Sequence, residues 1–406
     1  MEYFTSSSLS IWTLLKDYWP FFNTEHWIHG SNRIREHVTK SIDQIMKCKT
    51  WELWYMKLKC NNCCETKQIN FTCHKSACSR CSKPLCDKWI NNMRSWLPTH
   101  IEYIHITRTL PQELRELWLS FRSHRALNIL FKKAQKIILH FFESRFGCTP
   151  WVFSILHTFG SYINRNPHLH MVVTVWWLSE KNEWVDCKKS YLSYTAIKSQ
   201  WRALVIQECR FLLNKYQAHR KTYRKPIFEK TFEKKSWYIK MSDPIIDVHS
   251  VMWYLTRYMY RAPLAIANIK KTNLIPWDIN NSTLTIQYKH KKPVEVRTIT
   301  YTMKAFLGLL AQHIPDKYFR IVRYAWLFSH RKRKKSIQRI QELIPIPHNH
   351  LTLQERPLTY RQRLITIFQK DPYICHCCWD VMIPHSITFF ASRQQRFITR
   401  IITDTS

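Results

Sequence analysis

Two histidines, His168 and His170, stand two residues apart in the apolar run HLHMVVTVWWL. Side chains two positions apart in a β-strand point to the same face, so this spacing places both imidazoles side by side. A third histidine, His157, lies in the preceding run WVFSILHTFG, and the turn-like segment SYINRNP between the runs predicts an antiparallel pair. Such a pair would bring His157 across from the other two. We therefore predict a metal site with open coordination positions, with ordinary polar residues on a sheet face as the alternative.

Two tyrosines, Tyr254 and Tyr258, lie four residues apart in VMWYLTRYMYRAP, where the pattern predicts a helix over 247–261. At this spacing both rings emerge from one helix face, and Arg257 and Arg261 share that face. A tyrosine pair of this kind is usually part of a core or a stacking surface, but the arginines argue against a dry core. They favour a face that meets phosphate, where a phenol could attack a metal-polarised phosphodiester.

Two CxxC pairs, Cys60 with Cys63 and Cys78 with Cys81, are separated by 14 residues. Each pair can place two thiolates on one metal, so together they predict one closed tetrahedral zinc site with a structural role. Further potential ligands leave the choice open, and these are Cys64, Cys73, His74 and Cys86.

The charge balance predicts a polyanionic partner. The chain has 63 Lys and Arg against 28 Asp and Glu, a net charge of +35, and the basic residues are interleaved with 18 Trp, 19 Tyr and 21 Phe. Because phosphates attract cations and unpaired bases stack on aromatic rings, this composition favours single-stranded nucleic acid.

Several functional classes are excluded by composition. Four glycines in 406 residues leave no phosphate-binding glycine loop, so nucleotide hydrolysis and dinucleotide redox chemistry have no visible site. No apolar stretch is long enough for a membrane span, and the first residues lack the basic start of a signal peptide. We expect a cytoplasmic protein, in which the 14 cysteines are ligands or buried thiols rather than disulfides.

The elements that must position these residues predict an α+β fold. Apolar periodicity predicts helices within residues 1–58, 112–146, 195–216 and 303–314, a strand at IEYIHITRTL, and a hairpin from LTIQYKH and VEVRTITYT. We divide the chain into a small zinc-stapled helical module for DNA recognition over 1–97, a domain with a central antiparallel sheet and flanking helices over 98–330, and a basic C-terminal tail over 331–406. The tail carries a small cysteine knuckle, CHCC, at 375–378.

These motifs occur in the order found in the HUH endonucleases, and the chain resembles specifically the IS91-type rolling-circle transposases with an N-terminal zinc-binding domain. ILHTFGSYINRNPHLHMVVT resembles the family's LHTWGQ…HPHxH block, YLTRYMYR matches YLxRYxxR, and FLGLLAQHIPDKYFRIVRYAWL resembles a downstream block. IHITRTLP resembles the strand that opens the nuclease domain. The zinc motif CxxC…SCxxxxCPxC is matched by Cys60, Cys63, Cys73, Cys78 and Cys81.

The resemblance implies a catalytic Mg²⁺ or Mn²⁺ held by His168 and His170 over the scissile phosphate of single-stranded DNA. Imidazole favours zinc, copper and nickel, so substrate phosphate and water would have to supply the oxygens that these ions prefer. Tyr258 or Tyr254 would then attack, giving a 5′-phosphotyrosine and a free 3′-hydroxyl. Transposon ends and target DNA are the implied partners, in a bacterial, nucleoid-associated setting, with homo-oligomerisation left open.

Departures from the family pattern affect individual ligands. Ser161 stands where the family often has Gln, so His157 is our expected third ligand of the catalytic ion. His37 and Cys48 could form a second zinc site, for which the sequence offers no support. Two other functions remain open: a non-catalytic zinc-ribbon nucleic-acid-binding protein, and a plasmid replication initiator or relaxase with the same chemistry.

Overall fold

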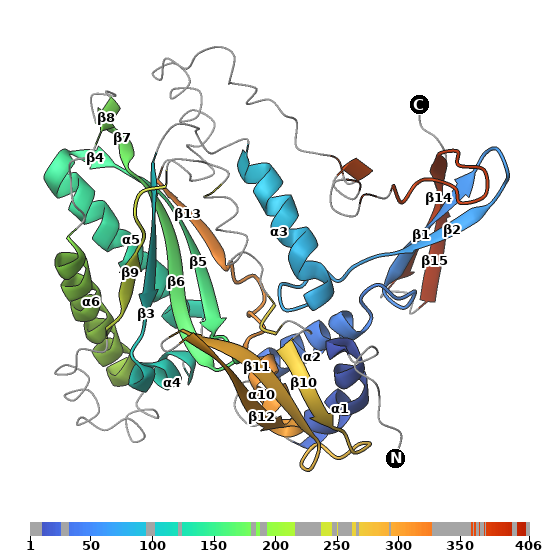
Figure 1. The fold of residues 1–406 in the computed structure, drawn as a ribbon, viewed down its shortest axis with the longest axis horizontal. Coiled ribbons are helices and arrows are strands. Elements are labelled where there is room, and N and C mark those ends of the chain that lie inside the picture. Colours follow the sequence, from blue (N-terminus) through green and yellow to red (C-terminus); the bar gives the residue numbers. More distant parts are fainter. Residues whose placement is uncertain are drawn as a thin grey trace. The chain divides into compact units, whose positions relative to one another are not determined.

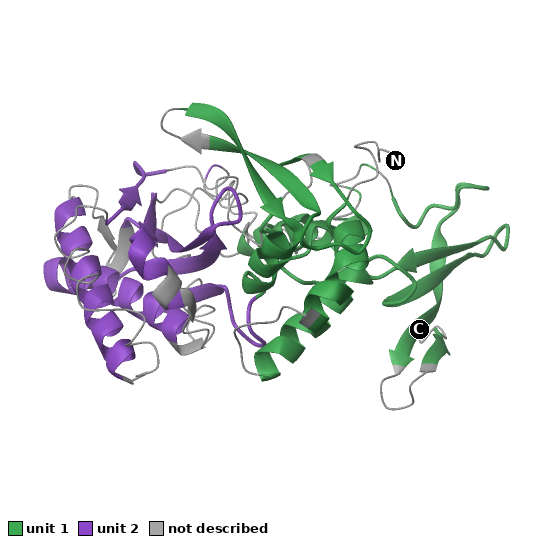
Figure 2. Cartoon of the chain, turned by 90° about the horizontal axis from the view of Figure 1, so that it is seen from below, with its two compact units in different colours: residues 1–95, 260–314, 354–406 green, residues 96–259, 315–353 purple. Residues whose placement is uncertain are grey.

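The chain divides into two compact units that do not follow its linear order. The computed structural model describes residues 10–25, 32–94, 102–120, 124–179, 184–186, 193–215, 237–245, 250, 262–264, 268–291, 294–326, 359, 361–362, 365, 369, 371–391 and 396–402. Unit 1 comprises residues 1–95, 260–314 and 354–406, and unit 2 comprises residues 96–259 and 315–353 (Figure 2). Unit 1 therefore takes segments from all three of the consecutive ranges that we expected. Among the described residues, no helix is both long and apolar enough to cross a membrane.

Unit 2 is built on a five-stranded antiparallel sheet of order β13-β5-β6-β3-β9. Its strands are β3 (Tyr103–Thr109), β5 (Trp151–Phe159), β6 (Arg165–Thr174), β9 (Ile239–Met241) and β13 (Val322–Trp326). Its helices are α4 (Gln112–Ser120), α5 (His124–Phe146) and α6 (Tyr194–Lys215), and a small sheet joins β4 (Cys148–Thr149), β7 (Trp176–Ser179) and β8 (Trp184–Asp186). The predicted strand pair β5–β6, the strand β3 and these helices are confirmed.

One face of the five-stranded sheet forms the core of unit 2. Alternate residues such as Ile106, Leu156 and Met171 are buried and pack in one hydrophobic cluster with side chains of the helices, including Trp118 and Trp201. Figure 1 shows α5 and α6 side by side along this sheet. Because side chains alternate along a strand, the residues between these apolar positions point to the opposite face.

Unit 1 combines helices with a second sheet. Its helices are α1 (Ile11–Glu25), α2 (Asn32–Met46), α3 (Ser79–Arg94) and α10 (Met303–Gln312), and its three-stranded sheet joins β10 (Ile269–Asn273), β11 (Thr283–Lys291) and β12 (Val294–Thr302). The predicted hairpin is confirmed, with Thr283 paired to Thr302 and Lys291 to Val294. The Tyr18 hydroxyl on α1 donates to the Ile275 carbonyl at 3.1 Å, which ties the N-terminal helix to this distant segment.

A four-stranded sheet in unit 1 corrects two expectations. It has the order β15-β14-β1-β2 and joins β1 (Trp54–Cys60) and β2 (Thr66–Asn70) to β14 (Met382–Ala391) and β15 (Arg396–Ile401). Figure 1 shows the blue and red strands side by side. The N-terminal module is thus not purely helical, and the C-terminal region is not only a basic tail. The mixed α+β class with antiparallel sheets is confirmed.

Candidate active site and metal centres

Three histidines converge on the face of the unit 2 sheet that lies opposite its hydrophobic cluster. His168 and His170 follow one another on this face of β6, and His157 on β5 is paired directly with His168. Their potential ligand nitrogens all lie within 4.8 Å of one another. His157 and His170 are buried, whereas His168 is half-buried, so the group is open on one side. The predicted juxtaposition is therefore present, and three imidazoles in this spacing fit one metal ion with free positions for substrate oxygens.

Backbone contact orients the ring of His168. Its Nδ1 lies 2.6 Å from the carbonyl oxygen of Asn166. A carbonyl only accepts hydrogen bonds, so Nδ1 carries the proton and the lone pair of Nε2 is available as a ligand. A hydrogen bond to the second ring nitrogen is the usual way in which proteins orient a metal-binding histidine.

A fourth histidine, His105 on β3, plays the same part for His170 and was not found from the sequence. Its Nε2 lies 3.0 Å from Nδ1 of His170, and the two rings are stacked with centroids 5.1 Å apart. Thr107 Oγ1 lies 3.3 Å from the same Nδ1. Burial, with the positive charges of Lys240 and His168, lowers the pKa of His105 to about 4, so at pH 7 it is neutral and can accept a hydrogen bond. The available signal was the alternation of IHITRT, which places His105 and Thr107 on one face.

The predicted nucleophiles belong to a part of the chain that the structure does not describe. Tyr254, Tyr258, Arg257 and Arg261, and nearly all of the helix predicted over 247–261, lie outside the described residues. Their roles stay predictions from the sequence.

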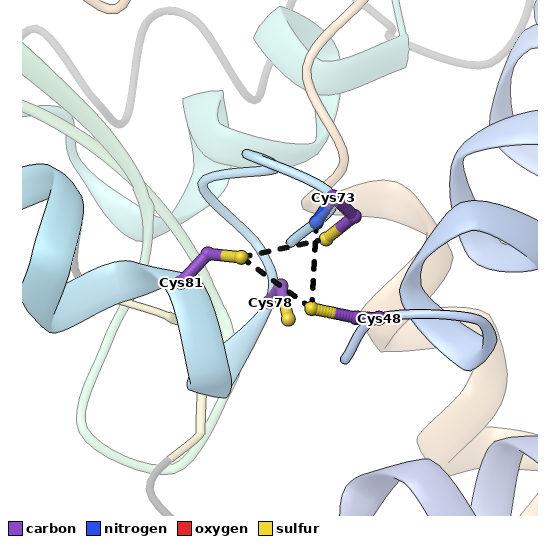
Figure 3. Close-up of side chains that lie close together, drawn as sticks. All are labelled: Cys48, Cys73, Cys78 and Cys81. Carbon is purple, nitrogen blue, oxygen red and sulfur yellow. Dashed lines mark hydrogen bonds between the residues drawn. The ribbon is translucent and has the colours of Figure 1, made fainter. Parts of the chain in front are cut away.

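The cysteines form two groups rather than one. Cluster A consists of Cys48, Cys73, Cys78 and Cys81, whose sulfur atoms lie within 4.8 Å of one another. Figure 3 shows these four side chains pointing toward one another, with the Cys81 sulfur 3.6 Å from those of Cys48 and Cys73. Cys48 joins this cluster, whereas His37 belongs to none of the clusters found among the described residues.

Local structure prepares the sulfurs of cluster A for a metal. Cys78 directly precedes α3 and Cys81 lies in its first turn, and a helix N-terminus stabilises thiolates. Hydrogen bonds from the thiols of Cys73 and Cys78 lower the pKa of Cys48 to about 7 and raise the pKa of Cys73 and Cys78. Four mutually close thiols, three of them buried, fit a closed tetrahedral zinc site.

Cluster B consists of Cys60, Cys63, Cys375 and Cys378, also within 4.8 Å of one another. The prediction that the pairs Cys60–Cys63 and Cys78–Cys81 share one site is therefore wrong in its arrangement. Cys60 ends β1 and Cys63 lies in the turn after it. Both meet the C-terminal knuckle, because that knuckle is followed by β14, which pairs with β1. The second pair instead meets Cys48 and Cys73.

Comparisons with known proteins match two regions of the chain, one near its N-terminus and one in its middle. The family described as a putative transposase matches residues 152–336, and the family described as a transposase zinc-binding domain matches residues 14–110. The transposase for insertion sequence element IS801 of Pseudomonas savastanoi pv. phaseolicola is 25% identical over 379 residues, which cover 89% of this chain and 87% of the relative. A putative transposase, y4qJ, of Sinorhizobium fredii is 22% identical over 352 residues, 82% of this chain and 84% of the relative. No solved structure matches.

Proposed function

Because the chain belongs to the IS91-type transposases, with both the putative-transposase and the zinc-binding regions of that family, we propose that it cuts and rejoins single-stranded DNA through a phosphotyrosine intermediate. The observation that carries this proposal is the three-histidine group on β5 and β6. It lies within the region matched by the transposase family, at the HLH motif that the sequence predicts as the metal site.

The histidines of this group would hold the catalytic cation. His157, His168 and His170 supply three nitrogens, and the more exposed His168 faces the side from which a DNA strand can approach. The Asn166 carbonyl and His105 keep two of these rings in the ligating tautomer. When bound there, Mg²⁺ or Mn²⁺ polarises the scissile phosphate and stabilises its developing negative charge.

The proposed nucleophile is Tyr258, with Tyr254 as the second tyrosine. The phenol of Tyr258 gives up its proton to solvent as its oxygen forms a bond to phosphorus. The bond to the 3′-oxygen of the preceding nucleotide breaks, and that oxygen takes up a proton from solvent and leaves as a 3′-hydroxyl. Arg257 and Arg261 would neutralise the phosphate during the attack. Because the phosphodiester is exchanged rather than hydrolysed, a 3′-hydroxyl can reverse the reaction and rejoin DNA without ATP.

Cluster A gives the chain structural zinc, and we assign it to the zinc-binding domain matched over 14–110. Its closed set of four sulfur ligands leaves no position for a substrate, so its role is to hold the end of α2, the start of α3 and the segment after β2 together. We propose that this region recognises the ends of the element, while the dispersed Lys and Arg bind the DNA backbone.

The experiment that tests the function is covalent capture of DNA. The protein is incubated with Mn²⁺ and a single-stranded oligonucleotide carrying the element end and a label at its 3′ end, and an adduct that resists SDS is sought. Wild type should form the adduct, and Tyr258→Phe should not. Tyr254→Phe should impair transposition more than first-strand cleavage. Tyr260→Phe is the matched control, because on the helix predicted from the sequence Tyr260 would be rotated about 200° from Tyr258. An adduct that survives in the double Tyr254→Phe, Tyr258→Phe variant would rule out this mechanism.

A further inference from the structure

We propose that cluster B is a second structural zinc site, assembled from knuckles at opposite ends of the chain. Cys60 and Cys63 come from the N-terminal strand β1 and the turn after it, and Cys375 and Cys378 come from the segment before β14. Cys63 and Cys375 are 312 positions apart. The zinc-binding family matches only residues 14–110, so this site extends beyond that domain and is independent of the DNA chemistry proposed above.

The sulfur positions suit one zinc ion. The Cys60 and Cys378 sulfurs are 3.4 Å apart, and those of Cys63 and Cys375 are 3.5 Å apart. Zinc bound by four thiolates has Zn–S bonds of about 2.3 Å, which in a tetrahedron separate the sulfurs by about 3.8 Å. All four cysteines are free thiols.

The two knuckles repeat the same hydrogen bonds, as expected of two halves of one zinc site. In each knuckle, the amide of the fourth residue after the first cysteine donates to that cysteine's carbonyl at 3.1 Å. The amide of the first cysteine donates to the carbonyl of the fifth residue after it at 2.9 Å. The first bond joins Cys64 to Cys60 and Trp379 to Cys375, and the second joins Cys60 to Glu65 and Cys375 to Asp380. The two knuckles, from opposite ends of the chain, thus share the same pattern of backbone hydrogen bonds.

That conformation directs backbone amides at sulfur. The amide of Glu65 donates to the Cys63 sulfur, and the amide of Asp380 donates to the Cys378 sulfur, at the equivalent position of each knuckle. Each knuckle also places a non-glycine residue in the left-handed region, Cys64 with φ 61° and Trp379 with φ 64°. This costs free energy, which metal binding can offset.

The sheet around cluster B has a small hydrophobic core. Among the described residues, its cluster contains four buried residues, Leu58, Cys60, Cys375 and Met382, with Met56, Ile69, Tyr373 and Cys378 partly buried against them. Two of the four buried residues are proposed ligands. On the same four strands, Trp54, Phe390 and Phe397 are exposed. Small folds of this kind usually depend on a metal or a disulfide. Zinc at cluster B would therefore hold β14 and β15 against β1.

Zinc content of the full-length protein provides the first test. We expect zinc coordinated by four sulfur atoms in X-ray absorption spectra, and a loss of one zinc per chain in Cys375→Ser relative to Cys377→Ser. Cys377 is the matched control, because it is an exposed thiol in the same knuckle and lies outside cluster B. Equal zinc content in the two variants would overturn the proposal.

Alkylation of the native protein, followed by mass spectrometry, tests which cysteines share an ion. Cys60→Ser should make Cys375 and Cys378 reactive while cluster A stays protected, and Cys64→Ser, which replaces an exposed thiol, should change neither. If Cys60→Ser instead exposes Cys78 and leaves the C-terminal knuckle protected, the two N-terminal pairs share one ion and the proposal is wrong.

Two buried thiols of unit 2, Cys148 and Cys209, report on the rest of the fold in the same experiment. If Cys60→Ser also makes them reactive, the whole chain has unfolded in that variant. The test is then alkylation of the wild-type protein with and without a chelator. Protection of Cys375 and Cys378 that is lost on adding a chelator then supports the site. Alkylation of both at the rate of Cys377, in zinc-loaded wild type, overturns it.

Discussion

Replacing His105 with alanine tests whether this histidine positions His170 for metal binding. The change removes the ring nitrogen that lies 3.0 Å from His170 Nδ1, while Thr107 Oγ1 still lies 3.3 Å from the same nitrogen. His170 can then turn or change tautomer, so that its Nε2 no longer points steadily at the metal. Loss of an outer partner of this kind lowers metal affinity about 10- to 100-fold. This equals about 1.4 to 2.8 kcal/mol.

The assay is Mn²⁺ binding without DNA, followed by electron paramagnetic resonance, together with the Mn²⁺ concentration that gives half-maximal adduct formation. For His105→Ala both should shift by about 10- to 100-fold, while saturating Mn²⁺ restores most of the cleavage rate. His105→Gln, whose amide oxygen can accept the hydrogen bond, should recover much of the affinity. His140→Ala, the same change at an exposed position on α5, should behave like wild type.

A merely structural role for His105 gives a different pattern. Its side chain is 2% exposed, so alanine also leaves a cavity and lowers stability by about 1 to 3 kcal/mol. Loss of stability alone would reduce the fraction of active protein without changing the Mn²⁺ concentration at half-maximal activity. If that concentration is the same in His105→Ala and His140→Ala, our account of the positioning contact is refuted.

His168→Ala should abolish adduct formation in Mn²⁺ while leaving affinity for single-stranded DNA largely unchanged, because the dispersed Lys and Arg carry that affinity; equal cleavage by mutant and wild type would exclude the metal role. Cys48→Ala should remove one zinc per chain and lower the thermal midpoint, whereas Cys64→Ala should do neither, as measured by metal analysis and circular dichroism. Arg108→Met should leave the free energy of unfolding unchanged or raise it by up to about 2 kcal/mol in urea titrations. Arg108 is fully buried, burial lowers its pKa to about 9, and its Nε and Nη2 have no partner within the described structure. A large loss of stability in Arg108→Met would show that the buried Arg108 side chain stabilises the folded protein.

The three-histidine group could be predicted from the sequence because its geometry is local. Two residues two apart on a strand share a face, and the short connection between β5 and β6 restricts their register, so His157 could be expected near His168 and His170. The helices α5, α6 and α10 and the hairpin β11–β12 could be predicted for the same reason. Each of these patterns depends on neighbouring residues along the chain.

The partners of the cysteine pairs were decided only by the tertiary structure. A CxxC pair brings two thiolates together through its own turn, but every such pair offers zinc the same chemistry, so spacing cannot show which two pairs share an ion. The strand pairing of β1 with β14 brings Cys60 and Cys63 to the C-terminal knuckle, and the loop after α2 brings Cys48 to Cys78 and Cys81. His105 was missed for the same reason, because its contact with His170 depends on the register of β3 against β6. Contacts between distant segments depend on the free energy of the whole fold, and no local pattern records them.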